Sequence, residues 1–147
     1  MRWEVTDALP GDAAPLARLI GEWVRETGWM PVLHTGKENE AFVAGLLETH
    51  VLRVARSGPD RLGFLARQRG RVQALHVAAG ARGLGIAKAL IDEVKSSETE
   101  ISLWVFQANS RAIAFYRREG FTVAEQTDGA GNDERLPDSR MIWSRTG

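Results

Sequence analysis

The sequence predicts one domain of mixed α/β class, with a central sheet of about six or seven strands and helices on both of its faces. Three observations support this prediction. Segments with strand and helix patterns alternate along the chain. Three consecutive extended segments are separated only by short turns, which indicates an antiparallel front half of the sheet. The chain has 147 residues, 44% of them hydrophobic, enough for one core, so we expect a single domain over residues 1–147.

The first half of the chain predicts a strand, two helices and three further strands. Residues 2–8 (RWEVTDA) are expected as the first strand. Asp12 precedes a helical pattern as its cap, while Thr35 and Glu38 have capping-box spacing before a second helix. Glycine and proline interrupt the stretch 27–34 (TGWMPVLH) between the helices. The three strands are expected at 51–57, 61–67 and 71–78.

The second half predicts two more helices and three more strands. The stretch 81–90 (ARGLGIAKAL) opens a third helix, with glycines in its first turn. Residues 100–106 (EISLWVF) are typical of a buried strand, and Gly120 is expected to end a fourth helix over 110–119. The last two strands are expected at 121–127 and 140–143, on either side of a long loop.

Composition excludes several classes of function. Nineteen basic residues balance nineteen acidic ones, so no overall field attracts nucleic acid or an anionic membrane. The chain has no cysteine, which excludes disulfides and thiolate metal sites, and its three histidines are dispersed. The sequence shows no signal peptide and no apolar run of about 18 residues. We therefore expect a cytoplasmic protein with no metal and no nucleic-acid or membrane partner.

The glycines of 81–90 need an explanation, because glycine inside a helix costs about 1 kcal/mol relative to alanine. Gly83, Gly85 and Ala87 remove side chains from a turn whose N–H groups have no helical partner and whose dipole favours an anion. This favours a phosphate site. Tight packing of the helix on a strand is the alternative. Walker and dinucleotide patterns fit less well, since Lys88 is misplaced for the first and the second lacks its acidic residue.

Two motifs resemble the acetyl-CoA-dependent N-acetyltransferases of the GNAT superfamily, of the type found in bacteria. The pyrophosphate-loop pattern [QR]-x-x-G-x-[GA] is matched by Arg82, Gly85 and Ala87. After the strand at 103–106, the chain also follows the pattern N-x-x-A-x-x-[FL]-Y-x-x-x-G-F. The residues that match this second pattern are Asn109, Ala112, Phe115, Tyr116, Gly120 and Phe121.

The resemblance implies a sheet that splays between its fourth and fifth strands, with acetyl-CoA as cosubstrate in the gap. The pantetheine arm then runs along the backbone of Leu75 and Val77 like an added strand. Asn109 is implied to hydrogen-bond this arm, a role compatible with capping its helix. The residues assigned to acetyl-CoA are Leu75, His76, Val77, Arg82, Gly83, Leu84, Gly85, Ile86, Ala87, Lys88, Asn109 and Tyr116.

The activity implied is direct attack of a primary amine on the acetyl thioester. The backbone N–H near Val77 would polarise the carbonyl, and Tyr116, the single tyrosine, would be the general acid for the leaving thiolate. A non-catalytic acetyl-CoA-binding or sensing module on the same fold is the alternative, and it would not need Tyr116. A small nucleotide-binding α/β protein is a second alternative.

The general base stays open. Several family members carry glutamate or histidine on the fourth strand, where this chain has Arg71 and Gln73. His76 lies one residue out of phase, as a packing histidine, unless a bulge changes its direction. The other candidates, besides a chain of water molecules, are Glu22, Glu26, His34, Asp133 and Glu134.

The acceptor is expected between the 27–36 break and the 126–138 loop. Trp29 and Met30 would form an apolar wall, with a plug between helices as the alternative. The acidic loop would hold a cationic amine, with a solvated turn as the alternative. The acceptor is a small-molecule or peptide amine, and since dimers are frequent in the family we expect a homodimer. The substrate-binding candidates are Trp29, Asn132 and Glu134.

Overall fold

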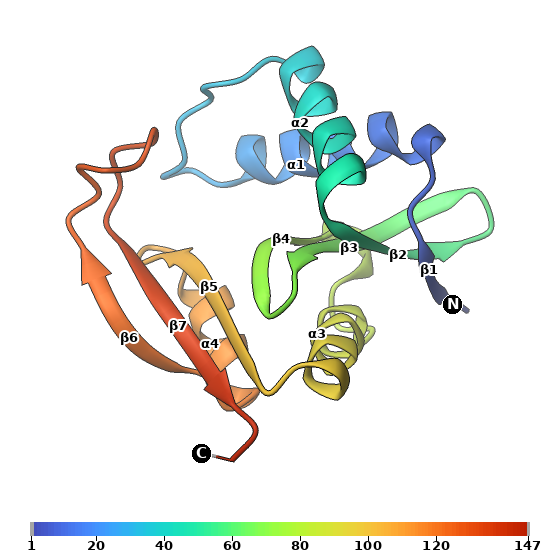
Figure 1. Cartoon of the computed structure of the whole chain (residues 1–147). Helices are drawn as coiled ribbons and strands as arrows, with labels where there is room; N and C mark the ends of the chain where they lie inside the picture. The colour runs from blue at the N-terminus through green and yellow to red at the C-terminus, as the bar shows by residue number, and fades with distance from the viewer. Residues whose placement is uncertain (1, 147) are drawn as a thin grey trace.

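The computed structural model describes residues 2–146, so the two end residues of the predicted domain 1–147 lie outside it. It contains one seven-stranded sheet in the order β1-β2-β3-β4-β5-β7-β6 (Figure 1). The strands are β1 (Glu4–Asp7), β2 (Val51–Ser57), β3 (Asp60–Gln68), β4 (Arg71–Val77), β5 (Glu100–Phe106), β6 (Thr122–Thr127) and β7 (Asp138–Ser144). The helices are α1 (Ala13–Glu26), α2 (Gly36–Thr49), α3 (Ile86–Ser97) and α4 (Ser110–Arg118), with short 3-10 turns η1 (Pro10–Asp12) and η2 (Ala79–Ala81). The predicted class and order of elements are confirmed.

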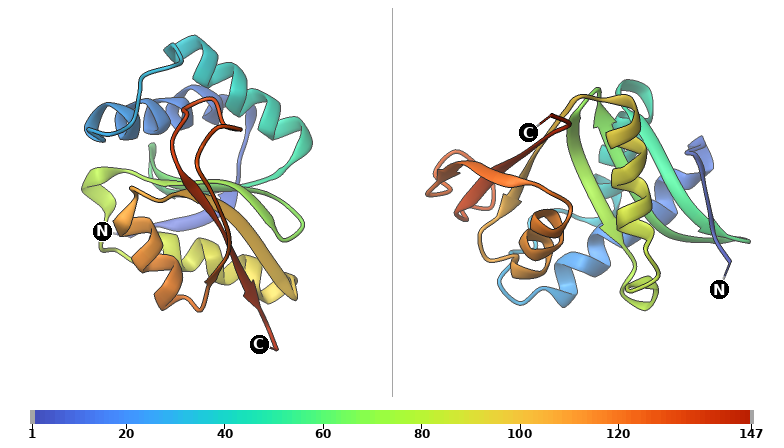
Figure 2. Two further views of the ribbon diagram at one scale, coloured as in Figure 1. Left: turned by 90° about the vertical axis from the view of Figure 1, so that its left-hand side faces the viewer. Right: turned by 90° about the horizontal axis from the view of Figure 1, so that it is seen from below.

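The sheet is open between β4 and β5. Strands β1 to β4 form an antiparallel meander, whereas β4 and β5 are parallel and meet at a single register pair, Arg71 with Ser102. At that end the Ser102 amide donates to the Gly70 carbonyl oxygen at 2.9 Å. Farther along, the two strands diverge (Figure 2), which confirms the predicted splay.

Helices cover both faces of the sheet, and each layer has its own core. Helices α1 and α2 lie on one face, while α3 and α4 lie on the other (Figures 1 and 2). The first core includes Leu16, Val43, Leu46, Val54 and Phe64. The second includes Leu90, Ile91, Ile101, Leu103, Phe121 and Met141. The helices described between residues 2 and 146 include none long and apolar enough to cross a membrane.

The predicted signals at the ends of two helices are present. The Thr35 hydroxyl accepts from the Glu38 N–H at 3.1 Å, and the Glu38 carboxylate accepts from the Thr35 N–H at 2.9 Å, which closes the capping box of α2. Gly120 follows α4 with φ +94°, the left-handed conformation in which helices commonly end.

The prediction that Asp12 caps α1 through its side chain is wrong. Its carboxylate accepts no hydrogen bond from the helix. It accepts instead from the Leu9 N–H at 2.8 Å, from Arg56 at 2.7 and 3.1 Å, and from Arg61 at 2.8 Å. Burial of Asp12, which is 1% exposed, raises the pKa of this carboxyl. The hydrogen bonds from Arg56, the Leu9 N–H and Arg61 outweigh burial and lower the pKa to about 2.

The prediction that glycines occupy the first turn of the third helix is also wrong. Helix α3 begins at Ile86, after both glycines. Gly83 and Gly85 each have φ +84°, and no atom lies within 4 Å of a Cβ built at either position. Close packing against a strand therefore does not explain them. The left-handed backbone of the turn does, because a side chain there is strained whatever the space around it.

Asp12→Asn should lower the free energy of unfolding by about 3 kcal/mol at pH 7, because it leaves two partly buried arginines without their charged partner. The lowered pKa means that the carboxylate stabilises the fold above about pH 4, and that this contribution is lost as the pH falls toward 2. Urea unfolding of both proteins from pH 7 to pH 2 measures the difference. Asp133→Asn, at an exposed position, is the control. Equal midpoints for wild type and Asp12→Asn would contradict the assignment.

Gly85→Ala should lower the free energy of unfolding by about 1 kcal/mol, because alanine is strained at positive φ. Gly45→Ala is the matched control, since Gly45 lies inside α2, also with no atom within 4 Å of an added Cβ. It should raise the free energy of unfolding by about 0.5–1 kcal/mol, as alanine loses less chain entropy. Thermal or urea unfolding measures both changes in the free energy of unfolding. Changes of opposite sign would show that the backbone conformation requires glycine at position 85, and a stabilised Gly85→Ala would refute this explanation.

Candidate active site

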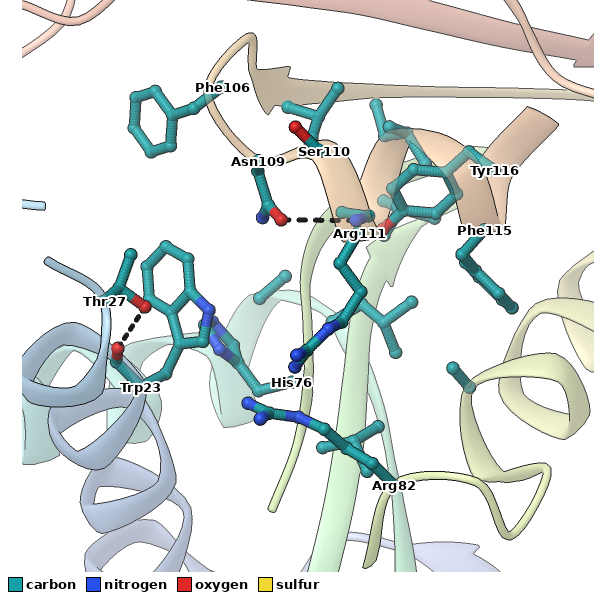
Figure 3. A pocket seen from close by; sticks show the side chains of 18 of the residues that line it. Trp23, Thr27, His76, Arg82, Phe106, Asn109, Ser110, Arg111, Phe115 and Tyr116 are labelled. Carbon is teal, nitrogen blue, oxygen red and sulfur yellow. Dashed lines mark hydrogen bonds between the residues drawn. The ribbon is translucent and has the colours of Figure 1, made fainter. Parts of the chain in front are cut away.

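A cleft of about 1130 Å³ occupies the opening between β4 and β5. The two strands form its sides, and the turn before α3 closes one end. The last turn of α1, the loop after it and helix α4 complete the lining (Figure 3). The cleft therefore draws on elements from both faces of the sheet.

One wall of the cleft is a free backbone edge. The Ala78 N–H donates to the Leu62 carbonyl oxygen at 2.8 Å, so Ala78 points toward β3. Peptide groups alternate along an antiparallel strand. The N–H and C=O groups of Leu75 and Val77 therefore point away from β3, toward the gap in front of β5. Such an edge can pair with an extended, amide-bearing ligand.

A β-bulge changes the phase of β4. The register with β3 shifts between Ala66 and Arg67, which leaves Gln73 as the extra residue. His76 lies on the α1 side of the sheet and lines the cleft. Its ring stacks on Phe64 with centroids 5.4 Å apart and meets Trp23 edge-on at 5.5 Å. Burial lowers its pKa to about 4, so the imidazole is neutral at pH 7.

Tyr116 places a phenol in the wall opposite β4. Its ring packs against Phe115 and Phe121, with centroids 5.3 and 5.4 Å away, and the residue is 7% exposed. Burial raises the pKa of this phenol above its ordinary value near 10. The hydroxyl has no hydrogen-bond partner among residues 2–146, yet no buried side-chain oxygen of that range is unsatisfied. The hydroxyl therefore keeps some accessible surface, and Tyr116 lines the cleft (Figure 3), where the phenol is a protonated donor at neutral pH.

Asn109 combines a structural position with a place in the cleft. Its side-chain oxygen accepts from the Ala112 N–H at 3.2 Å and caps α4 (Figure 3). Its amide nitrogen makes no hydrogen bond within residues 2–146 and can donate to a ligand. Arg111 follows on the same helix, and Figure 3 shows its side chain extending into the cleft toward Arg82.

The turn before α3 supplies charge at the end of the cleft. Arg82 forms an ion pair with Glu26, the last residue of α1. Lys88 lies 3.3 Å from the Glu119 carboxylate and 3.5 Å from that of Asp92. Leu84 belongs to the predicted set but does not line the cleft, because its side chain is turned outward and is 39% exposed.

Aromatic side chains form the part of the cleft next to α1. The rings of Trp23 and Trp29 meet edge-on with centroids 5.9 Å apart, and Trp29 meets Phe106 at 5.8 Å. Trp29 was a predicted substrate contact. Trp23 and Phe106 were not, since the sequence marks them only as apolar members of a helix and a strand. Only the folded structure shows that Trp23 of α1 and Phe106 of β5 both contact Trp29.

Two predicted substrate residues lie elsewhere. The Asn132 amide donates to the Leu136 carbonyl oxygen at 2.8 Å and its oxygen accepts from the Leu136 N–H at 3.2 Å. These two hydrogen bonds tie Asn132 to the backbone of Leu136 within the loop between β6 and β7. Neither Asn132 nor Glu134 lines the cleft. The structure therefore does not bring these two residues to the predicted site.

Among the predicted base candidates, Glu26 and His76 line the cleft. Glu22 lies in a separate hollow beside Arg61, and His34 approaches Glu38 at 4.0 Å on the surface. Asp133, like Glu134, is outside the lining. Within residues 2–146, no group of three or more histidine, aspartate or glutamate side chains is placed to hold a metal ion.

Comparison with known proteins finds two curated relatives. Peptidyl-lysine N-acetyltransferase YiaC of Escherichia coli is 39% identical over 84 residues, which cover 56% of this chain and 56% of that protein. Peptidyl-lysine N-acetyltransferase YjaB of the same organism is 28% identical over 92 residues, 62% of this chain and 63% of that protein. The matches thus span little more than half the length of either relative.

Solved structures share the fold over nearly the whole chain. The apo form of YjaB from Escherichia coli has a TM-score of 0.80 at 21% sequence identity. The match covers 97% of this chain and 98% of the YjaB chain. YncA of Salmonella typhimurium, solved with its cofactor acetyl-CoA, has a TM-score of 0.75 at 16% identity, with 98% and 94% covered. The model of the acetyltransferase (GNAT) domain family matches residues 40–123, more than half of the chain. The chain therefore belongs to the GNAT acetyltransferase family.

Proposed function

We propose that this protein transfers the acetyl group of acetyl-CoA to the side-chain amine of a peptidyl lysine. The observation that carries the proposal is the open phenol of Tyr116, which shares one cleft with the free backbone edge of β4. Two relatives named peptidyl-lysine N-acetyltransferases support the choice of acceptor. The acetyl-CoA complex of YncA, on the same fold, supports the choice of cosubstrate.

The lining residues fit acetyl-CoA by their chemistry. The peptide groups of Leu75 and Val77 can exchange hydrogen bonds with the amides of the pantetheine arm. The turn from Arg82 to Gly85 offers backbone N–H groups, a guanidinium and open space at both glycines, as a diphosphate requires. The amide nitrogen of Asn109 adds a donor on the opposite wall. Of the predicted cofactor set, all residues except Leu84 line the cleft.

The reaction joins the amine nitrogen to the acetyl carbonyl carbon while the carbon–sulfur bond breaks. The Val77 N–H points into the gap and would polarise the carbonyl oxygen. The Tyr116 hydroxyl would give its proton to the departing sulfur, which leaves as the thiol of CoA. The proton lost by the amine passes to solvent, and the Tyr116 phenolate takes a proton back from solvent. The phenol is thereby restored and charge balances.

A thiol-release assay with acetyl-CoA tests the function. We expect turnover with a peptide whose single free amine is a lysine side chain, and little with the same peptide acetylated on that lysine. Acetyl-CoA at 100 times its Kd should add about 2.7 kcal/mol to the free energy of unfolding. Stabilisation by ATP or NAD in place of acetyl-CoA, or absence of thiol release with every amine tried, would refute the proposal.

Tyr116→Phe should lower kcat about 100-fold, the usual contribution of a general acid, and leave the Kd for acetyl-CoA within about twofold. Phenylalanine keeps the ring packing on Phe115 and Phe121, so stability should change little. Because burial raises the pKa of the phenol, the wild type should not lose activity through phenol ionisation below about pH 10. Steady-state thiol release and calorimetric titration measure both constants. Unchanged turnover would remove Tyr116 from the mechanism.

The cytoplasmic location and the homodimer stay predictions from the sequence. The same holds for the expected absence of nucleic-acid and membrane partners. A dimer would be measured directly by light scattering of the purified chain. None of the residues assigned above depends on its outcome.

A further inference from the structure

Glu26 and Arg82 form an ion pair at the edge of the cleft. Glu26 is the last residue of α1, and Arg82 belongs to the turn assigned to the diphosphate. Their side chains are 36% and 32% exposed. Such partly exposed pairs contribute little free energy, so a stronger anion can displace the carboxylate at small cost. Figure 3 shows Arg82 directed away from its own turn, toward the side of the cleft formed by Trp23 and α1.

Glu26 differs from the other carboxylate of the lining. Glu119 is 9% exposed and is held by Lys88 at 3.3 Å and Lys95 at 3.2 Å. The charge of Glu119 is therefore neutralised by two lysines of α3, which link α3 to the end of α4. The Glu26 carboxylate has one cationic partner within residues 2–146, and that partner is the arginine which the cosubstrate would engage.

Two tryptophans line the same cleft as Glu26. Trp23 precedes it by three residues on α1, a spacing that places two side chains on one side of a helix. Trp29 follows in the next loop and contacts both Trp23 and Phe106. Ring faces next to a carboxylate are the surroundings that an alkylammonium group binds, through cation–π attraction and a charge-assisted hydrogen bond.

We propose that Glu26, with Trp23 and Trp29, binds the ammonium group of the acceptor, and that Glu26 becomes available when the diphosphate of acetyl-CoA takes Arg82. The bound ammonium gives one proton to solvent before its nitrogen attacks the thioester. This inference rests on the proposed function and adds the acceptor site to it. A diphosphate carries more charge than one carboxylate and also meets the N–H groups of the turn. Arg82 therefore exchanges partners, and the carboxylate that it leaves lines one cleft with Trp23 and Trp29. Binding of acetyl-CoA consequently strengthens binding of the acceptor.

Glu26→Gln tests the acceptor site in the full chain. The KM for a lysyl peptide should rise about tenfold or more, the range expected for a lost charge-assisted hydrogen bond. The kcat should stay within about twofold, and the Kd for acetyl-CoA should be unchanged or up to about threefold tighter. Glu48→Gln, at an exposed position of α2, is the matched control and should behave as wild type.

Two results would overturn the assignment. An unchanged KM in Glu26→Gln, with a wild type that turns over, would exclude Glu26 from acceptor binding while leaving the proposed function intact. A fall in kcat at constant KM, together with loss of the acidic limb of the pH–rate profile, would make Glu26 a base instead. A different result would refute the proposed function itself, namely a wild-type protein that releases no thiol from acetyl-CoA with any amine.

Arg82→Ala tests the exchange of partners by calorimetry with lysyl peptide. Without CoA, this variant should bind the peptide about threefold tighter than wild type, since its Glu26 is already released. Addition of desacetyl-CoA, which forms no product, should tighten peptide binding to wild type more than to Glu26→Gln. Equal peptide affinity of wild type and Arg82→Ala without CoA, or a wild type that is insensitive to CoA, would refute the exchange.

Discussion

The structure depends on one close backbone approach between β4 and β5. The Gly70 carbonyl accepts from the Ser102 N–H at 2.9 Å, and a Cβ at Gly70 would lie 2.0 Å from the Glu100 carbonyl oxygen. Since a side chain cannot fit there, glycine allows the two halves of the sheet to join at this point. Because the two strands pair only at Arg71 and Ser102, they are free to separate toward the other end. The cleft is the direct consequence of that geometry.

Separation of the strands leaves the peptide groups of Leu75 and Val77 without a neighbouring strand. Backbone donors and acceptors buried without partners cost free energy, so such an edge is stable only where water or a ligand reaches it. A cleft of about 1130 Å³ admits both. The Tyr116 hydroxyl, on the opposite wall, likewise has no hydrogen-bond partner among the described residues. The site therefore consists of polar groups that the fold leaves unpaired, on walls that aliphatic and aromatic packing keeps rigid.

Local signals and the splayed fold implied by the family motifs were predictable, whereas side-chain contacts between distant elements were not. The capping box of Thr35 and Glu38 and the end of α4 at Gly120 depend on neighbouring residues, so the sequence identifies them. Asp12 has the spacing of a helix cap, but two arginines of distant strands compete for its carboxylate and prevail. Asn132 is similar: an acidic, flexible-looking loop suggests ligand binding, whereas its amide closes the loop. The contact of Trp23 with Trp29 also depends on the tertiary structure, so the sequence does not predict it.

Net charge is a poor guide to this cleft. The whole chain is neutral, yet the described lining carries Arg82, Lys88, Arg111 and Arg118 against Glu26 and Glu119. A concave surface with this excess attracts a polyanion, even though no overall field does. The same excess repels a cationic acceptor until the anion has entered. Under our proposal, acetyl-CoA strengthens acceptor binding through the local field as well as through the pairing of Glu26 with Arg82, and both effects act through the negative charge that it supplies.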